Sequence, residues 1–331
     1  MKLLTRSLAA LVVAAAIAGP ASAEVSEIRI TKQPSIIYLP VVIMEQQKLI
    51  EKHAKAAGLD LKATWMTFTS GGAATDALLS GNVDLVTSGA TNMLLLWSRT
   101  GGQVKGLSGV AAVPMLLYTR NPDVKTIKDF TEKDKIAVPT IKVSTQATVL
   151  HIAAEKLMGP GGAEKLDKFT IQLGHPDAYT QVMNPNLEVD SHFGAPPYQY
   201  EALKNPGIHV VLDSAEVMGG PASNAVTFGT TKFHDANPKA IKAFLAALNE
   251  AKQLIDTDKK AAVQIYLDAT KENYQPDELV EMISKPNTVY GPVPYAVGQF
   301  GEYMAKSGLL KSKPASWKDT FFADVHDLPG S

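Results

Sequence analysis

The sequence of 331 residues contains no cysteine. This absence excludes disulfide scaffolds, thiolate zinc sites, iron–sulfur clusters and thiol nucleophiles. Neither sign of charge dominates, because 32 Lys and Arg stand against 33 Asp and Glu, so a nucleic-acid binder with a basic face is not expected. Hydrophobic residues make up 45% of the chain, which argues against intrinsic disorder. The length fits roughly two domains of about 150 residues each.

The motifs of common enzyme classes are absent as well. The sequence has no G-x-S-x-G, H-E-x-x-H, P-loop, S-x-x-K or G-x-G-x-x-G pattern. Its seven histidines show no i, i+4 pair that would place two metal ligands on one helix face. Asp84 and Asp190 lie inside strand-like runs, and we expect them to accept hydrogen bonds from nearby loops rather than to act as acid and base. We therefore expect no catalytic residue, no metal site and no cofactor.

The first residues have the pattern of a secretory signal peptide. Lys2 and Arg6 precede an uncharged run from Leu8 to Ala18, and Ala21-Ser22-Ala23 gives a small-x-small cleavage site. The run is shorter than the ~20 residues that a membrane-spanning helix needs. Cleavage after Ala23 changes the formal charge from −1 to −3. No cysteine is available there for a lipid anchor, so we expect a free protein in the periplasm.

The chain after the signal peptide alternates strand-like and helix-like segments. Strands are expected near Val25 to Ile30, Leu61 to Phe68 and Val83 to Thr87, and a helix is expected from about Pro40 to Lys55. This alternation predicts a parallel sheet covered by helices, the α/β class.

The alternation is interrupted by two adjacent strand-like runs and then resumes. Later strands are expected near 135–138, 169–173, 187–193 and 208–212, and the chain beyond residue 230 is mostly helical. The pattern predicts one α/β unit, a crossover near 110–120, a second unit, and a return near 222–230. We expect a hinged protein with a discontinuous lobe I, made of 24–112 and 226–331, and a lobe II made of 113–225.

A short motif occurs twice in the first half. Thr69-Ser70-Gly71 and Thr87-Ser88-Gly89 both lie where a strand ends and a helix begins. Ligands of open α/β sheets bind beyond the carboxyl ends of strands, and helix N-termini attract anions. Ser and Thr are also ordinary helix caps, so capping and ligand binding both remain open for these residues.

Matching segments occur elsewhere. Ser144-Thr145 opens a predicted helix in the second unit, with Lys142 just before it, and the stretch from Phe193 to Tyr198 links a strand end to a helix start. The stretch from Pro34 to Tyr38, which includes Ser35, has the same place in the first unit. Tyr38 and Tyr198 either line a ligand or pack in the core, and whether Lys142 or His192 contacts a ligand is open.

Arginine is scarce. After the signal peptide only Arg29, Arg99 and Arg120 are present, and none lies in a strand-end loop. A bidentate arginine clamp on a phosphate or carboxylate therefore has no candidate. The scarcity favours a small or singly charged ligand over a phosphate ester.

Several of these motifs resemble one family. Ser70-Gly71-Gly72, the run from Ala77 to Asp84, and Ser88-Gly89 resemble the signature of periplasmic solute-binding proteins for nitrate, sulfonate and taurine. The run from Ile136 to Pro139 followed by Ser144-Thr145 is similar to that family's second lobe, and the run from Pro314 to Asp319 resembles the tail of one subgroup. The resemblance extends over essentially the whole mature chain. It implies a two-lobed, type II Venus-flytrap fold with two crossover strands.

The resemblance also implies a function. The chain would be the binding component of an ABC importer, which captures a small organic anion by hinge closure and delivers it to an inner-membrane permease. The anion would be a sulfonate, a taurine-like compound, an aromatic or aliphatic carboxylate, or nitrate, and the protein would act as a monomer. The stretch Phe193–Pro197 differs from the aromatic and acidic stretch common in sulfonate binders. By position, the ligand contacts would fall on Ser35, Tyr38, Ser70, Gly71, Ser88, Gly89, Ser144, Thr145, Pro197 and Tyr198.

Two alternatives remain from the sequence. One is a protein that binds a pyrimidine precursor of thiamine, or an enzyme that makes it on the same fold, although such enzymes use cysteine-rich chemistry that this chain lacks. The other is a sensory module that reports its ligand to a membrane receptor.

Overall fold

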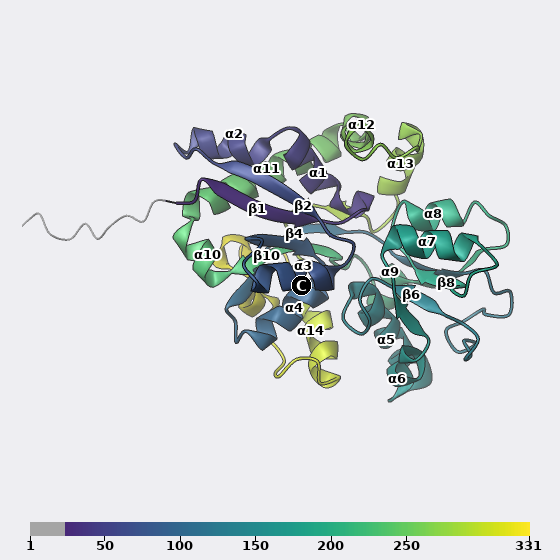
Figure 1. Ribbon diagram of the computed structural model, residues 1–331. Coiled ribbons are helices and arrows are strands. Elements are labelled where there is room, and N and C mark those ends of the chain that lie inside the picture. Colours follow the sequence, from purple (N-terminus) through teal and green to yellow (C-terminus); the bar gives the residue numbers. More distant parts are fainter. Residues whose placement is uncertain (1–23) are drawn as a thin grey trace, which may run out of the picture.

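The computed structural model describes residues 24–331, and the expected signal peptide lies outside the described residues (Figure 1). Two mixed β-sheets form the framework, each flanked by helices. The six-stranded sheet has the order β11-β4-β10-β3-β1-β2, and the five-stranded sheet has the order β7-β6-β8-β5-β9. The first contains Glu27–Lys32 (β1), Lys62–Thr67 (β2), Leu85–Ser88 (β3), Val104–Ala112 (β4), Ala225–Thr230 (β10) and Val289–Tyr290 (β11), and the second contains Leu116–Thr119 (β5), Ile136–Val138 (β6), Thr170–Gln172 (β7), Ser191–Phe193 (β8) and His209–Asp213 (β9).

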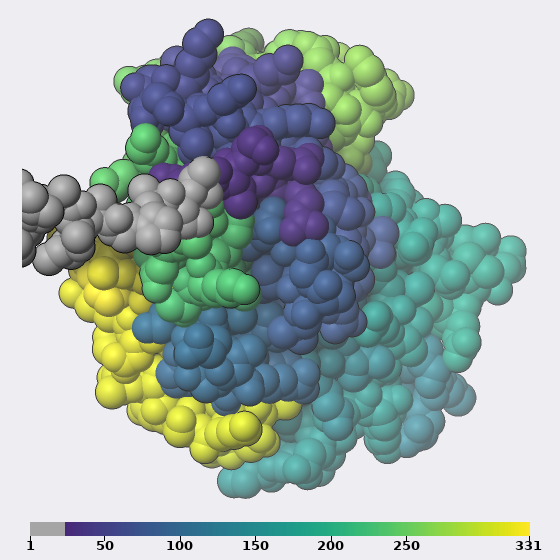
Figure 2. Space-filling model, turned by 60° about the vertical axis from the view of Figure 1, so that its left-hand side comes forward, coloured from purple at the N-terminus to yellow at the C-terminus, as the bar shows by residue number. Residues whose placement is uncertain are grey.

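The chain passes between the two sheets twice. It leaves the six-stranded sheet between β4 and β5 and returns between β9 and β10. β10 runs antiparallel between β3 and β4, while β1, β2 and β3 are mutually parallel. In the second sheet β5 runs antiparallel to β8 and β9. The six-stranded sheet is thus built from both ends of the chain, and Figure 2 shows purple N-terminal and yellow C-terminal segments in one body.

Helices cover both faces of the six-stranded sheet. One cluster of buried side chains joins α1, α2, α11, α12 and α13 to the sheet, and another joins α3, α4, α14 and the tail to it and to α5. The helices are Leu39–Gln46 (α1), Leu49–Ala56 (α2), Gly71–Leu79 (α3), Ala90–Arg99 (α4), Thr145–Met158 (α5), Gly162–Asp167 (α6), His175–Met183 (α7), Tyr198–Ala202 (α8), Ser214–Met218 (α9), Thr231–Ala236 (α10), Pro238–Thr257 (α11), Lys259–Thr270 (α12), Pro276–Ile283 (α13) and Val297–Lys306 (α14), with 3₁₀ turns at Ile36–Tyr38 (η1), Trp317–Thr320 (η2) and Ala323–Val325 (η3). No helix among residues 24–331 is both long and apolar enough to cross a membrane.

The single helix expected from Pro40 to Lys55 is wrong. The chain forms α1 and α2, separated at Lys48, which adopts a left-handed backbone with φ of 50°. The cause lies in packing. α1 is buried from Leu39 through Met44, whereas α2 buries only one side, so the helix axis changes direction where the environment changes.

The strand expected over 187–193 is shorter than predicted, because β8 begins at Ser191. The Arg120 guanidinium explains the difference. It donates to the backbone carbonyls of Leu187 and Val189, so these groups are satisfied outside the sheet ladder. The region beyond residue 230 is mostly helical as predicted, with β11 as a short addition.

The C-terminal segment is held against the six-stranded sheet by the aromatic side chains of Trp317, Phe321 and Phe322. Phe321 is buried, and its ring occupies the space that a Cβ on Gly106 would need, 2.4 Å from the nearest ring atom. The backbone N–H of Phe322 donates to the Gly106 carbonyl at 2.8 Å. The tail is therefore part of the core.

We expect Phe321→Ala to lower the free energy of unfolding by about 3–5 kcal/mol, because it removes a fully buried ring from a tightly packed site. Urea unfolding followed by circular dichroism measures the change. Leu79→Ala is the control, since Leu79 is 58% exposed and its truncation leaves no cavity. Equal unfolding midpoints for the two variants would show that the tail does not contribute to the core.

Candidate functional site

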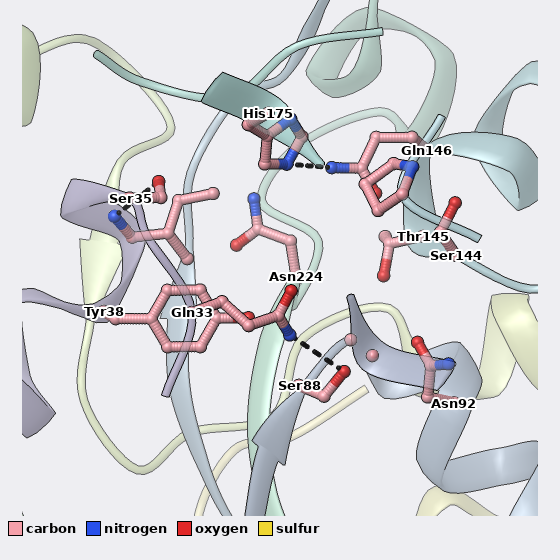
Figure 3. Close-up of a pocket in the computed structure, with 14 residues that line it drawn as sticks. Gln33, Ser35, Tyr38, Ser88, Asn92, Ser144, Thr145, Gln146, His175 and Asn224 are labelled. Carbon is pink, nitrogen blue, oxygen red and sulfur yellow. Dashed lines mark hydrogen bonds between the residues drawn. The ribbon is translucent and has the colours of Figure 1, made fainter. Parts of the chain in front are cut away.

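A small cavity lies between the two sheets, where helices from both approach each other (Figure 3). Its volume is about 30 Å³, which leaves room for only a few water molecules. The lining is dominated by hydroxyl and amide side chains together with glycines. These residues are Gln33, Ser35, Ile37, Tyr38, Gly71, Ser88, Gly89, Asn92, Pro139, Ser144, Thr145, Gln146, His175 and Asn224.

Four helix N-termini meet at this cavity. Gly71 is the first residue of α3, Gly89 is the N-cap of α4, Ser144 is the N-cap of α5, and His175 is the first residue of α7. The first N–H groups of a helix have no partner within the helix, and the N-terminus carries a partial positive charge. The arrangement is therefore suited to an anion or to another group rich in hydrogen-bond acceptors.

The serine hydroxyls around the cavity are arranged as donors. Ser88 Oγ accepts from Gln33 Nε2 at 3.3 Å, and Ser144 Oγ accepts from the backbone N–H of Ala147 at 3.2 Å. Neither hydroxyl donates to another group among residues 24–331, so the hydrogen of each is available to a ligand. The capping and binding interpretations of Ser144 are therefore compatible.

One aromatic side chain lines the cavity, and it comes from the 3₁₀ turn η1 that follows β1. Tyr38 is buried, and Figure 3 shows its ring reaching into the middle of the site beside Gln33. Burial raises the pKa of Tyr38, so the hydroxyl keeps its proton at every physiological pH. Ser35 lies beside it, and its hydroxyl donates to the Pro196 carbonyl at 2.5 Å, which joins the two sides of the cavity.

Gln146 and His175 come from the first turns of α5 and α7, the helices that follow strands β6 and β7. His175 Nε2 lies 3.2 Å from Gln146 Nε2, and His175 Nδ1 lies 2.9 Å from His192 Nε2. Burial lowers the pKa of His175 to about 4 and the pKa of His192 well below its usual value. Both imidazoles are therefore neutral near pH 7, and no residue that lines the cavity carries a formal charge.

Seven of the ten residues predicted from the sequence line this cavity, and three do not. The Ser70 hydroxyl caps α3 by accepting from Ala73 N. Pro197 is buried but is not part of the lining, and the Tyr198 hydroxyl lies 3.5 Å from Glu272 Oε1. The seven that line it are Ser35, Tyr38, Gly71, Ser88, Gly89, Ser144 and Thr145.

The charged and histidine candidates lie outside the lining. Lys142 pairs with Asp167 at 3.3 Å. Asp84 has the structural role expected of it, but it accepts from the backbone and guanidinium of Arg29 in strand β1 and not from a loop. His192 is fully buried and reaches the cavity only through His175.

Seven lining residues were missed by the sequence analysis. Five are polar, namely Gln33, Asn92, Gln146, His175 and Asn224, and two are apolar, namely Ile37 and Pro139. Two of them could have been predicted from their position in the sequence. Gln146 directly follows the Ser144-Thr145 motif, and Asn92 lies one helical turn after Gly89, so both share a helix start with a predicted contact. His175 also begins a helix after a strand end, but no Ser-Gly or Ser-Thr motif marks it.

Asn224 also connects the two crossovers. Its amide donates to the Val113 carbonyl at 2.7 Å and accepts from the Val113 N–H at 3.3 Å. Val113 follows β4 and Asn224 precedes β10, so this pair ties the two chain passages together beside the cavity. Among residues 24–331, no group of three or more His, Asp or Glu side chains is arranged to hold a metal ion.

A second hollow lies on the outside of the six-stranded sheet, between α3, β3 and α10. It is larger, at about 330 Å³, and is lined by Asp84, Lys232, Phe233 and neighbouring residues. The long helix α11 begins at this hollow, because its N-cap Asn237 is part of the lining, but the N–H groups of Lys239 and Ala240 in its first turn already donate to the Glu24 carboxylate. The hollow also does not lie between the sheets. The smaller cavity is the better candidate because size alone does not make a binding site, whereas converging donors do.

Two α/β sheets connected by two chain passages, with a polar cavity between them, define the periplasmic-binding-protein fold. The chain belongs to the NMT1-like family, whose family model matches residues 21–267. A sequence search of curated proteins finds no match.

Solved structures with this fold include binding proteins of known ligand. The alkanesulfonate-binding protein SsuA from Xanthomonas axonopodis pv. citri, bound to MOPS, is 18% identical with a TM-score of 0.70, and the match covers 88% of this chain and 96% of that one. The aliphatic sulphonate binding protein SsuA from Escherichia coli is 20% identical with a TM-score of 0.64, over 88% and 95% of the two chains. The nitrate-binding protein NrtA from Synechocystis PCC 6803 is 17% identical with a TM-score of 0.65, over 90% and 84%.

Proposed function

We propose that this chain is the extracytoplasmic substrate-binding component of an ABC importer, and that it captures a small organic anion or nitrate between its two lobes. The observation that carries the proposal is the convergence of four helix N-termini and several hydroxyl donors on one uncharged cavity. Neutral donors of this kind stabilise a singly charged ligand without a counter-charge. The sulfonate-binding and nitrate-binding proteins that share the fold support the same class of ligand.

We assign residues 24–112 and 226–331 to lobe I and 113–225 to lobe II. The assignment follows the two sheets, because the chain changes sheet between β4 and β5 and again between β9 and β10. Ala225, the first residue of β10, falls on the lobe II side of the second boundary. Contacts between the lobes meet at the cavity rim, where Thr91 Oγ1 lies 3.5 Å from Thr145 Oγ1. Rotation about the crossovers that Val113 and Asn224 join would open and close this rim.

The remaining parts of the proposal follow from the role. A receptor of this kind binds its ligand without chemical change, so it needs no catalytic residue or cofactor. It works as a monomer in the periplasm after removal of the signal peptide, and its protein partner is an inner-membrane permease. The pyrimidine-binding alternative differs only in the ligand, so one screen addresses both.

A thermal-shift screen with nitrate, acetate, benzoate, methanesulfonate, taurine and an aminopyrimidine tests the proposal. A ligand present at 100 times its Kd adds about 2.7 kcal/mol to the free energy of unfolding. We expect at least one anion to raise the Tm by several degrees. A shift by the pyrimidine alone would replace the anion with that ligand class, and no shift by any compound would contradict the proposed function.

A further inference from the structure

A chain of buried polar side chains leads from the cavity into the core of lobe II. Tyr118 Oη lies 2.7 Å from His192 Nδ1, and His192 Nε2 lies 2.9 Å from His175 Nδ1. His175 Nε2 then lies 3.2 Å from the Gln146 amide, the last link, which Figure 3 shows at the edge of the cavity. Tyr118 and His192 are fully buried, and only Gln146 and His175 line the cavity.

The fold holds these residues in line. Tyr118 and His192 are direct partners across the antiparallel strands β5 and β8. Gly194, two residues after His192, leaves room for the tyrosine ring, because a Cβ there would lie 2.8 Å from it. Gln146 and His175 are placed by the starts of α5 and α7.

Along such a chain, every group must donate its hydrogen in the same direction, either towards the cavity or towards Tyr118. A neutral histidine has one N–H donor and one acceptor nitrogen, so the hydrogen bond at one nitrogen decides the role of the other. The chain therefore has two arrangements, in which every hydrogen is reversed. In one, both histidines are protonated on Nδ1, and in the other, both are protonated on Nε2.

The two arrangements differ at the buried end. With both histidines protonated on Nδ1, Tyr118 accepts from His192, and its own O–H finds no acceptor among residues 24–331. With both protonated on Nε2, the Tyr118 O–H donates to His192, and His192 Nε2–H donates to His175 Nδ1. A buried donor without a partner is costly, so the second arrangement is favoured.

This second arrangement fixes the other end of the chain. His175 Nε2–H then requires an acceptor, and Gln146 supplies one when a half-turn of its terminal amide exchanges oxygen and nitrogen without moving any other atom. The amide NH₂ group becomes the part of Gln146 that is open to the cavity, since no other residue of the described chain bonds to that amide.

We propose that Tyr118, His192 and His175 form a one-way hydrogen-bond chain that holds Gln146 with its oxygen on His175 and its NH₂ group towards the cavity, so that Gln146 selects ligands that carry a hydrogen-bond acceptor. The ligand class is a carboxylate, sulfonate or nitrate oxygen, and not an ammonium or amide N–H. This inference rests on the proposed function for its ligand but not for its hydrogen-bond pattern. Tyr118, His192 and His175 act as positioning residues.

The hydrogen-bond pattern is tested on the protein without ligand. Long-range ¹H–¹⁵N correlation spectra of the ¹⁵N-histidine-labelled protein at pH 7 identify which nitrogen of each ring carries the proton. We expect Nε2–H for both His175 and His192. Nδ1–H on either ring would overturn the inference, whatever ligand the protein binds.

Tyr118→Phe removes the hydroxyl that sets the direction, and the buried ring is kept. We expect His192 to lose its strict Nε2–H form in this variant, and the circular dichroism spectrum to stay unchanged. An unaltered histidine pattern would show that Tyr118 does not control the chain. If the variant fails to fold, the wild-type spectra still decide the matter.

The role of Gln146 is tested with methanesulfonate, acetate and nitrate as probes in calorimetric titrations. Gln146→Glu keeps an acceptor for His175 but presents a carboxylate oxygen to the ligand, and we expect a ten- to hundredfold loss of affinity. Gln253→Glu is the control, since it adds the same charge on an exposed position of α11. Equal affinities in the two variants would overturn the inference. If no probe binds the wild-type protein, the proposed function fails, while the histidine spectra still test the hydrogen-bond chain.

Discussion

Gly89→Val is expected to abolish ligand binding and to leave the fold intact. Gly89 belongs to lobe I, and a Cβ at this position would lie 2.5 Å from Thr145 Oγ1 of lobe II and 3.2 Å from Asn92 Oδ1. The Gly89 backbone has φ of −58° and ψ of 143°, which any residue adopts, so the substitution introduces no backbone strain. The valine would instead hold the lobes apart and occupy the cavity. Binding of the anion found in the screen should weaken at least a hundredfold by calorimetry.

The matched control is Gly72→Ala. Gly72 lies in the neighbouring helix start, and its added Cβ would lie 3.5 Å from Thr140 and 3.9 Å from Ser70 Oγ, which are ordinary contacts. We expect affinity within a few-fold of wild type and an unfolding midpoint that is unchanged or slightly raised. If Gly89→Val binds as tightly as Gly72→Ala, the lobes do not close on Gly89 and the site is elsewhere.

The second large effect is an acid-induced loss of stability from His175. Its pKa is about 4 in the folded protein against 6.5 in the unfolded chain, because burial disfavours the charged ring. Between these values the unfolded chain binds a proton that the native protein does not, so the free energy of unfolding falls as pH falls. At 1.36 kcal/mol for each pH unit, the loss from His175 approaches about 3 kcal/mol at pH 4. Buried His192 acts in the same direction.

Other groups titrate in this range, so the prediction concerns the difference in pH-dependent stability between the wild-type protein and a His175 variant. Burial raises the pKa of Glu272, and this carboxyl favours the native state as pH falls, against the effect of His175. His175→Gln removes the titration and keeps a hydrogen-bonding side chain. Urea unfolding between pH 7 and pH 4 should show that the free energy of unfolding falls more steeply with pH for wild type than for the variant. Parallel curves would mean that His175 is accessible to protons in the native state.

The fold was predictable because it depends on local pattern and chain order. Alternating strands and helices, followed by two adjacent strands near 104–119, predicted two α/β units with a crossover. The break at Lys48 was not predictable, since no Gly or Pro marks it and its cause is the packing around α1. The short β8 depends on Arg120, which is distant in sequence from the carbonyls that it satisfies.

The site was predictable where it consists of helix starts. Ser88, Gly89, Ser144 and Thr145 follow strand ends, and parallel strands bring their carboxyl ends to one edge. Tyr198 was predicted to contact the ligand because it begins a helix after a strand end, but its hydroxyl lies 3.5 Å from Glu272 Oε1 instead. His175 and Gln33 also lie at strand ends, after β7 and β1, and were missed because no Ser-Gly or Ser-Thr motif marks them.

The most direct test of the account is a crystal structure with the anion that gives the largest thermal shift. The account predicts the ligand between the lobes, within hydrogen-bond distance of the Ser88 hydroxyl, the start of α5 at Thr145 and the Gln146 amide. A ligand found instead in the outer hollow beside Asp84 and Phe233, with the cavity between the lobes unchanged, would contradict it.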